Sequence, residues 1–230
     1  DLYAVQREVD YTEGTSGLWY PKREAPILAE LVQEGKLPPV EERVGSEPVV
    51  IEGVDGIGKY GGTWNIVTNS AATLATIESW MSGSCMVRWS PMGYPIVPHV
   101  AKRWEVTPDK KEWTFYLRKG MKWSDGHPFT AEDILYWWEH EVKDEIIGFP
   151  AWMKVRGKKG DILKIDSHTV KFIFPSPHSL LLERLGPTHE FFSPRHYMEP
   201  YHPQLGDEEL IEGMMRVNKI PQKNALYITL

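Results

Sequence analysis

The sequence has few of the features that stabilise a disulfide-linked protein or anchor one in a bilayer. Its one cysteine, Cys85, has no partner for an intramolecular disulfide, and its apolar neighbours indicate a small buried residue rather than a nucleophile. No run approaches the roughly 20 apolar residues of a membrane span. The sequence opens at Asp1 without signal-peptide regions, which fits either a processed protein or a piece of a longer one. We therefore expect a chain that does not span a membrane and leave open a lipid anchor upstream.

A concentrated basic face is also missing. The net charge is −6 and the pI is near 5.8, whereas binding to nucleic-acid phosphates needs clustered cations. The nearest approach is a short group of lysines and arginine, which we interpret as a solvated, mobile loop: Lys154, Arg156, Lys158 and Lys159. The composition thus argues against a nucleic-acid partner.

Motifs for cofactors, metals and catalysis do not reach their required form. Gly53 to Lys59 fits the first seven positions of a phosphate-binding loop, but Tyr60 stands where a magnesium-binding hydroxyl is needed, and a predicted strand follows instead of a helix. His189, His196 and His202 are spaced too loosely for a zinc site. No G-x-S-x-G elbow surrounds Ser84. We expect no cofactor, no metal and no catalytic residues.

Aromatic residues are what the chain has in abundance. It contains 10 Trp, 10 Tyr and 7 Phe in 230 residues. Most of these rings are expected to pack in the core, and a few can line a binding cleft.

The first half of the chain predicts short elements joined by stiff or glycine-rich connections. Residues 1–23 show no period and are interpreted as extended or partly disordered. An amphipathic helix is predicted from Ala25 to Gly35, with Pro26 in its first turn. Residues 37–43 are expected to form an extended connector because of their prolines. Strands are predicted at 49–51 and 63–67, and an extended piece at 94–98.

The second half predicts two β-hairpins and several helices. One hairpin joins 104–106 to 113–118, with Trp113, Phe115 and Leu117 inward and Arg118 outward. A turn containing Gly126 then leads to a helix capped by Thr130 and Asp133. The other hairpin joins 162–165 to 169–174. Helices are predicted at 179–185, from Ser193 to about residue 201, and at 208–215.

Several blocks in this order resemble the family 5 extracellular solute-binding proteins. They are Gly58-Lys-Tyr-Gly-Gly-Thr-Trp-Asn-Ile66, Val100-Ala-Lys-Arg-Trp-Glu-Val106, Trp113-Thr-Phe-Tyr-Leu-Arg118, Lys122-Trp-Ser-Asp-Gly126, Phe129-Thr-Ala-Glu-Asp133, Lys164 to Pro175, and Ser193-Pro-Arg-His-Tyr197. Each block alone is weak, but together, from about residue 25 to 202, they are specific. Family members are more than twice as long, so the chain resembles a truncated member.

The resemblance implies a fold and a domain plan. The fold is a type II (cluster C) periplasmic-binding-protein-like N-terminal lobe of the α/β class, incomplete, with a mixed sheet of hairpins and flanking helices. Residues 1–57 would be an N-terminal extension with a short helix, 58–202 part of the N-terminal lobe, and 203–230 a truncated tail. Residues 218–230 match nothing in the family pattern.

The resemblance also implies a function without catalysis. The chain would belong to the substrate-binding component of an ABC importer, monomeric, periplasmic or extracellular, and membrane-associated through the permease subunits. It would capture a peptide or an oligosaccharide in a cleft between two lobes that close over it. Two alternatives stay open: a hydrolase acting on glycans, and a sensory or scaffolding module of the same fold.

By the same resemblance, positions after the first strand and after the signature helix reach the ligand cleft. They are Asn69, Ser79, Trp80 and Met81 from the first region and Phe149 and Trp152 from the second. Ordinary packing or loop exposure remains an equal alternative for each of them. Trp123, Trp137 and Trp138 are expected to build the core of the lobe.

Overall fold

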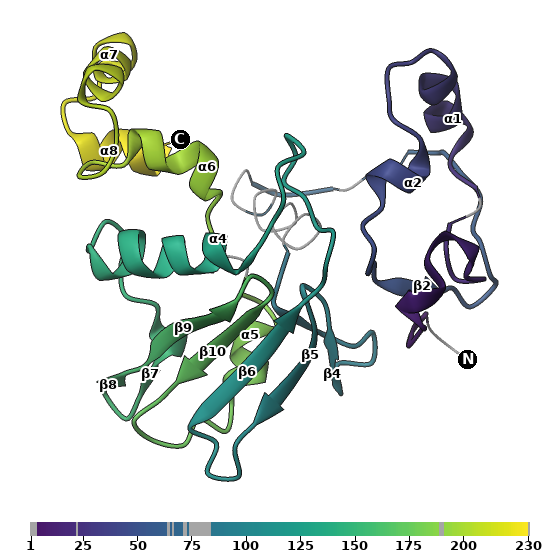
Figure 1. The fold of residues 1–230 in the computed structure, drawn as a ribbon, viewed down its shortest axis with the longest axis horizontal. Helices are drawn as coiled ribbons and strands as arrows, with labels where there is room; N and C mark the ends of the chain where they lie inside the picture. The colour runs from purple at the N-terminus through teal and green to yellow at the C-terminus, as the bar shows by residue number, and fades with distance from the viewer. Residues whose placement is uncertain are drawn as a thin grey trace. The chain divides into compact units, whose positions relative to one another are not determined.

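The computed structural model describes residues 4–21, 23–63, 65, 67–70, 73, 84–188 and 191–229 (Figure 1). The chain divides into two compact units. Unit 1 comprises Asp1–Lys102, Arg118–Lys122 and Leu182–His189, and unit 2 comprises Arg103–Leu117, Trp123–Leu181 and Glu190–Leu230. No helix in the described ranges is both long and apolar enough to cross a bilayer.

Unit 2 is built around a four-stranded antiparallel sheet in the order β5-β6-β10-β9 (Figure 1). Its strands are β5 (Ala101–Val106), β6 (Glu112–Leu117), β9 (Asp161–Asp166) and β10 (Thr169–Ile173). Alternation places Trp113, Phe115 and Leu117 in the core, as predicted. Phe115 packs against Phe172 of β10 with ring centroids 5.1 Å apart. Both predicted hairpins are confirmed, although β5 begins three residues earlier than expected.

The signature helix starts where its capping residues indicate. The Thr130 side chain accepts from the Glu132 N–H, and Asp133 accepts from the Thr130 N–H at 2.8 Å, which forms a capping box. Helix α4 (Ala131–Tyr136) continues into the π-helical segment η2 (Trp137–Lys143). Trp137 and Trp138 are buried as predicted, and Trp123 is half-buried.

The remaining elements of unit 2 follow the sheet and the signature helix. They are η3 (Ala151–Met153), β7 (Lys154–Val155), β8 (Lys158–Lys159), α6 (Arg195–Met198), η4 (Glu199–Tyr201), α7 (Glu208–Asn218) and α8 (Lys223–Thr229). Helix α7 confirms the predicted helix and extends it by three residues. Helix α8 occupies the stretch for which the sequence offered no pattern, and its Leu226 and Tyr227 are buried.

Two local predictions in unit 2 were wrong. The basic group is a hairpin rather than a loop, because Arg156 and Gly157 adopt positive φ of 51° and 76°, the geometry of a two-residue hairpin turn. Ser193 does not cap the next helix; Pro194 takes that position. The Ser193 hydroxyl instead donates to Glu141, 52 residues away, a contact that local spacing does not reveal.

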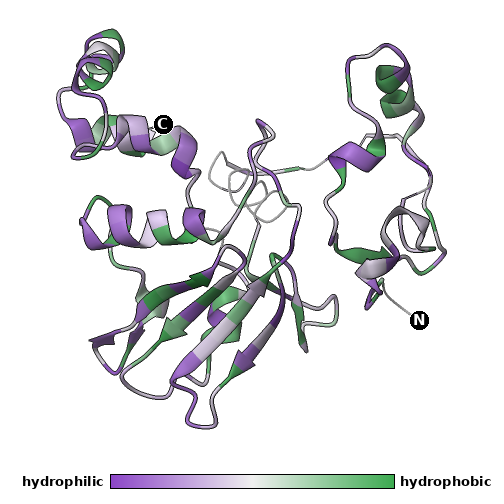
Figure 2. Cartoon of the chain, in the orientation of Figure 1, coloured by the Kyte–Doolittle hydropathy of each residue, from purple (hydrophilic) through white to green (hydrophobic). Residues whose placement is uncertain are grey.

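Unit 1 consists of short elements. They are β1 (Val5–Arg7), the 3-10 helix η1 (Tyr11–Ser16), α1 (Pro26–Gln33), α2 (Val40–Arg43), β2 (Val50–Glu52), β3 (Val87–Trp89), β4 (Ile96–Pro98) and most of α5, whose full range is Leu181–Leu185. Strand β1 pairs with β2 and β3 pairs with β4, both antiparallel. Hydrophobic residues are visible on α1 in Figure 2, and Gly35 ends that helix with φ of 69°, as predicted.

Three predictions for the N-terminal segment need correction or fall outside the description. Residues 5–7 and 11–16 are ordered, because β1 finds its partner β2 about 45 residues away. Residues 40–43 form α2, because Pro39 precedes the helix, where a missing N–H costs nothing. Trp64 and Ile66 of the predicted strand at 63–67 lie outside the described residues, and the described 63, 65 and 67 are not assigned to a strand.

Arg118 was predicted to point outward but is buried, with 4% of its surface exposed. Its Nε donates to the His99 carbonyl at 2.6 Å, and its Nη1 donates to the Tyr11 hydroxyl at 2.6 Å. The same Nη1 reaches the Glu47 and Pro48 carbonyls at 3.3 and 3.2 Å. Arg118 is buried because remote segments supply acceptors for its rigid fork of donors.

Glycine allows two segments of unit 1 to touch beside Arg118. A Cβ on Gly45 would lie 2.5 Å from the Gly120 carbonyl oxygen, and a Cβ on Gly120 would lie 2.5 Å from the Ser46 N. Gly120 also has φ of 78°. Both positions therefore need glycine for this close backbone approach.

Candidate functional site

The first group of predicted ligand residues is described only at Asn69. Its side chain is exposed, and its Oδ1 accepts from the Thr73 hydroxyl at 2.9 Å. Thr73 Oγ1 lies 3.0 Å from Ser70 Oγ, so three polar side chains form a small surface network. The other predicted residues of this region, Ser79, Trp80 and Met81, lie outside the described residues.

The second group, Phe149 and Trp152, is brought together with the signature helix segment. Trp152 stacks on Trp137 with ring centroids 6.1 Å apart and planes 3° from parallel. Phe149 meets Trp138 edge to face at 5.5 Å. Trp137 and Trp138 are buried, whereas Phe149 and Trp152 are half-buried. Their role as ligand contacts stays a prediction.

Two lysines from the β7–β8 hairpin lie over the Phe149 ring. The Nζ atoms of Lys154 and Lys159 are 5.1 and 4.7 Å from the ring centroid. Such cation–π contacts contribute about 0.5–1 kcal/mol at exposed sites. The arrangement holds an aromatic ring beside charged donors at the surface, which suits the apolar face and hydroxyl groups of a sugar or the backbone of a peptide.

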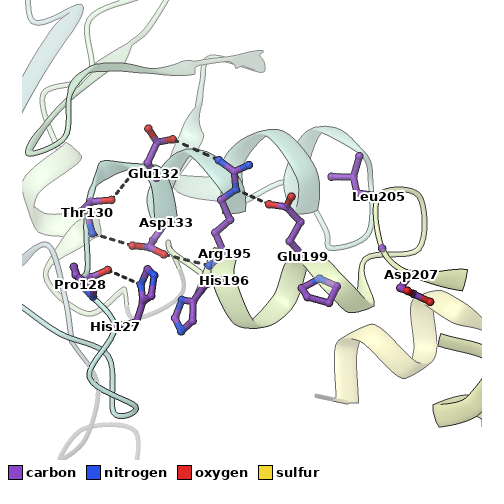
Figure 3. Close-up of a pocket in the computed structure, with 12 residues that line it drawn as sticks. His127, Pro128, Thr130, Glu132, Asp133, Arg195, His196, Glu199, Leu205 and Asp207 are labelled. Carbon is purple, nitrogen blue, oxygen red and sulfur yellow. Dashed lines mark hydrogen bonds and ion pairs between the residues drawn. The ribbon is translucent and has the colours of Figure 1, made fainter. Parts of the chain in front are cut away.

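A separate open pocket of about 530 Å³ lies where the start of α4 meets α6 (Figure 3). It is lined by residues from three segments of unit 2: His127, Pro128, Thr130, Glu132, Asp133, Arg195, His196, Glu199, Pro200, Leu205, Gly206 and Asp207. The capping box of α4 forms one wall, because Asp133 Oδ1 also accepts from the Arg195 N–H at 3.2 Å (Figure 3).

Every carboxylate of this pocket has a partner within the protein. Arg195 donates to Glu199 at 2.5 Å and lies 3.9 Å from Glu132 (Figure 3). The bond from Arg195 holds the pKa of Glu199 below its usual value. Asp207 accepts from the Leu210 N–H at 2.9 Å and so caps α7. The carboxylates of the pocket therefore hold its lining segments together through bonds within the protein.

Two histidines stack at the edge of the pocket. The rings of His127 and His196 lie 3.8 Å apart and 11° from parallel. His196 Nε2 is 2.6 Å from Asp125 Oδ2, and this bond, followed by the His127 N–H, lowers the pKa of Asp125. Among the described residues, no group of three or more His, Cys, Asp or Glu side chains is arranged to hold a metal ion.

The described carboxylates can be compared with the acid that a glycan hydrolase would need. A glycosidase needs an acid whose pKa is raised and which meets the substrate. Burial raises the pKa of Glu141, but this residue is only 5% exposed, and its carboxyl accepts hydrogen bonds from the Tyr227 and Ser193 hydroxyls. The pocket carboxylates are engaged in ion pairs, backbone hydrogen bonds or caps, and the described carboxyl group whose pKa is raised, that of Glu141, does not line the pocket.

The sequence analysis named Thr130, Asp133 and His196 but did not predict that they line a pocket. His127, Arg195 and His196 all lie within or beside the blocks that carry the family resemblance. About 70 residues separate His127 from His196, and nothing in either block indicates that the rings meet. A search for histidines that follow turn residues near helix starts could have selected His127 and His196 as candidates. It would not have predicted that their rings stack.

A comparison with known protein families agrees with the resemblance seen in the sequence. The model for "Bacterial extracellular solute-binding proteins, family 5 Middle" matches residues 95–213, more than half of the chain. The chain belongs to this family of solute-binding proteins.

Similar proteins of known name are binding proteins. The periplasmic alpha-galactoside-binding protein of Rhizobium meliloti is 31% identical over 170 residues, which cover 64% of this chain and 24% of the relative. The periplasmic oligopeptide-binding protein OppA of Escherichia coli is 52% identical over 50 residues, which cover 22% of this chain and 9% of the relative. This chain thus spans about a quarter or less of the length of these relatives.

Solved structures agree with the expected fold. An oligopeptide-binding protein OppA superposes with a TM-score of 0.80 at 35% identity, covering 93% of this chain and 33% of that one. The periplasmic binding protein MelB of Agrobacterium fabrum, solved with stachyose, gives a TM-score of 0.66 at 23% identity over 99% of this chain and 34% of that one. The type II periplasmic-binding-protein fold with mixed α/β content is confirmed.

Proposed function

We propose that this chain forms part of the substrate-binding component of an ABC importer, acting in the periplasm or outside the cell. In this proposal the chain binds a solute without transforming it and presents it to permease subunits. Residues 1–230 would supply a share of one lobe, and a further lobe would complete the cage around the ligand. Localisation at the membrane would then come through the transporter.

The observation that carries the proposal is the joint match in sequence and structure. The family model covers residues 95–213, and the likeness to OppA extends over 93% of the chain with a TM-score of 0.80. The lobe itself adds support, because the carboxylates that line its pocket have partners within the protein and its half-buried rings suit stacking rather than proton transfer.

We propose a peptide or an oligosaccharide as the ligand class. A relative at 31% identity is named for α-galactosides, and relatives at higher identity over shorter stretches are named for oligopeptides. Aromatic rings serve both classes, since sugar C–H faces and peptide side chains each pack on them. The choice between them depends on polar groups placed around the rings.

Calorimetric titration tests the proposal. The protein encoded by the whole gene is titrated with stachyose, with related α-galactosides and with a set of oligopeptides of three to five residues. Binding of one class at micromolar concentration, with the ligand recovered unchanged by mass spectrometry, is the expected result. Cleavage of the ligand, or no binding by any member of either class, would contradict the proposal.

The predicted ligand residues are tested in the same assay. Trp152→Ala should weaken binding about tenfold or more. A sugar ring or a peptide side chain stacked on a tryptophan contributes on the order of 1–2 kcal/mol of binding free energy. Trp104→Ala is the matched control, since Trp104 is another half-buried tryptophan, on β5. Equal affinities for the two variants, each confirmed folded by its thermal transition, would remove Trp152 from the site.

Residues 1–230 tested alone should bind far more weakly than the whole protein. Half of the contacts and the closing step would be missing, while the costs of ordering the ligand would remain. Micromolar affinity of this segment by itself would contradict the two-lobe cage while leaving the ligand class intact.

A further inference from the structure

The carboxyl group of Glu141 is buried in unit 2, and no described lysine or arginine forms an ion pair with it. Its side chain lies on η2, and the residue is 5% exposed. Oε1 accepts from the Tyr227 hydroxyl at 2.7 Å, and Oε2 accepts from the Ser193 hydroxyl at 2.9 Å. Tyr227 Oη also lies 3.0 Å from the Tyr136 hydroxyl. A chain of hydroxyl groups thus connects helix α8 to α4 and η2.

The positive charges on the surrounding elements are directed to other carboxylates. Lys143 on η2 pairs with Glu139 at 2.8 Å and with Asp161 at 3.0 Å. The ring of His140, on the same segment, lies 3.3 Å from Asp144. None of these partners is Glu141, so η2 supplies no neutralising charge to its own buried acid in the described structure.

The elements packed against η2 follow the same pattern. Arg195 pairs with Glu199 at 2.5 Å, and Lys223 on α8 pairs with Glu208 at 2.6 Å. The acids of α4 are also committed, since Asp133 caps its own helix and Glu132 pairs with Lys164 and Arg195. His196 pairs with Asp125.

His202 is the remaining ionisable ring that faces Glu141, and its own hydrogen bonds are made to backbone groups. It is fully buried, with Nε2 2.9 Å from the His140 carbonyl oxygen. Its Nδ1 accepts from the backbone N–H groups of Gln204 and Leu205, each at 3.2 Å. Because a backbone N–H can only donate, Nδ1 is the acceptor in these two bonds, and both ring nitrogens are therefore held by backbone groups other than Glu141.

The hydroxyl chain satisfies Glu141 in either protonation state. When the acid is ionised, Tyr136 donates to Tyr227, and Tyr227 and Ser193 donate to the two carboxylate oxygens. When the acid is neutral, its O–H donates to Tyr227 and the Tyr227 O–H turns to Tyr136. The neutral state places no unpaired charge in the interior, and the ionised state does, so the two states differ in how well they hold α8.

We propose that Glu141 and Tyr227 form a proton-dependent latch that holds helix α8 against η2, tight when Glu141 is neutral and loosened when it ionises. Leu226 and Tyr227 are the buried residues of α8, so the latch sits at the centre of the docked face. The phenol groups themselves stay protonated, because burial raises the pKa of Tyr136 to about 12 and also raises that of Tyr227.

The direction of the pH effect follows from linkage. Burial raises the pKa of Glu141 when α8 is docked, opposed by the bonds from the Tyr227 and Ser193 hydroxyls and by the nearby His202. The docked state therefore binds the proton more tightly than the released state. Docking is strongest below the ordinary glutamate pKa of about 4.3 and weakens as the pH rises through the raised value, by at most about tenfold per pH unit.

Hydrogen–deuterium exchange of the 230-residue chain tests the latch. The protection of the α8 amides, corrected for intrinsic exchange, is followed from pH 5 to pH 8, with the β10 amides as an internal reference for the lobe. In the wild-type protein, α8 protection should fall with rising pH relative to β10. A flat or rising profile would overturn the proposal.

Two variants separate the latch from other titrations. In Glu141→Gln the pH dependence of α8 protection should disappear, because the titrating carboxyl is gone, while β10 protection is kept. His202 and the surface ion pairs are unchanged in this variant, so a pH dependence that came from them would remain. In Tyr227→Phe the protection of α8 should fall about tenfold at every pH, since one hydrogen bond to the carboxyl is lost. A wild-type pH slope in Glu141→Gln, or wild-type protection in Tyr227→Phe, would refute the latch.

Discussion

Between residues 4 and 57, the helices bury no side chain completely: α1, α2 and η1 each lack a buried residue. Leu18 is 98% exposed there and Ile27 is 66% exposed. In the sheet of unit 2, Phe115 and Phe172 are fully buried, and their rings lie 5.1 Å apart. The first region is fixed by polar contacts to a few anchors, whereas the second is fixed by close packing of apolar side chains.

The difference explains why the two regions should respond differently to mutation. Apolar packing spreads stability over many contacts, so a single deletion leaves a cavity and affects the whole sheet. A polar anchor such as Arg118 concentrates several hydrogen bonds in one residue, so its loss should release the attached segments while the rest of the fold persists.

The largest effect is expected for Phe172→Ala in β10. Phe172 is fully buried and contacts both Phe115 and Trp152, so removing the ring should lower the free energy of unfolding by about 3–5 kcal/mol. Urea denaturation followed by tryptophan fluorescence measures this loss. A loss of less than 1 kcal/mol would show that the sheet is not the packed centre of unit 2.

The next effect is expected for Arg118→Met, which keeps the length of the side chain but removes its donors. The carbonyls of His99, Glu47 and Pro48 and the Tyr11 hydroxyl lose their shared donor, at a cost of about 2–3 kcal/mol. Hydrogen exchange should increase in residues 5–16 and 47–52, while β6 and β10 keep their protection. Equal increases in all these segments would contradict the idea of a local anchor.

A smaller effect is expected for Thr130→Ala at the start of α4. The change removes the side-chain acceptor for the Glu132 N–H and half of the capping box, at a cost of about 1 kcal/mol. Thr130→Ser, which keeps the hydroxyl, serves as the control and should lie within a few tenths of a kcal/mol of wild type. Thermal denaturation compares the three proteins, and equal losses for Ala and Ser would exclude capping as the cause.

The smallest effect is expected for Leu18→Ser. Because this side chain is 98% exposed, its replacement should change the free energy of unfolding by less than about 0.5 kcal/mol. Denaturation of the 230-residue chain measures the change. A loss above 1 kcal/mol would mean that Leu18 is covered by a partner or by another part of the protein in solution.

The sequence predicted elements best where neighbouring residues decide the structure. The alternation of Trp113, Phe115 and Leu117 fixed the inward face of β6, and the Thr130–Asp133 pair fixed the start of α4. In both cases the relevant interactions lie within a few residues. Pairing across a long separation escaped prediction, as β1 with β2 and the ring of His127 with that of His196 demonstrate.

The candidate site divides in the same way. The aromatic nature of Phe149 and Trp152 was visible in the sequence, but their packing against Trp138 and Trp137 was not. Arg118 and Ser193 were misassigned because each one's partners lie far away in the chain. Local spacing carries no information about such partners, since any surface position can receive them once the fold is formed.

By itself, the sequence determined the positions of the two hairpins and the start of α4, because periodicity, capping and turn chemistry act over a few residues. The class of the fold and the family were indicated by the resemblance of several sequence blocks. Only the tertiary structure decided which polar side chains are buried and with whom they pair. Burial of Arg118 and Glu141 depends on whether donors and acceptors from remote segments arrive to satisfy them. That condition is a property of the assembled fold and not of any stretch of chain.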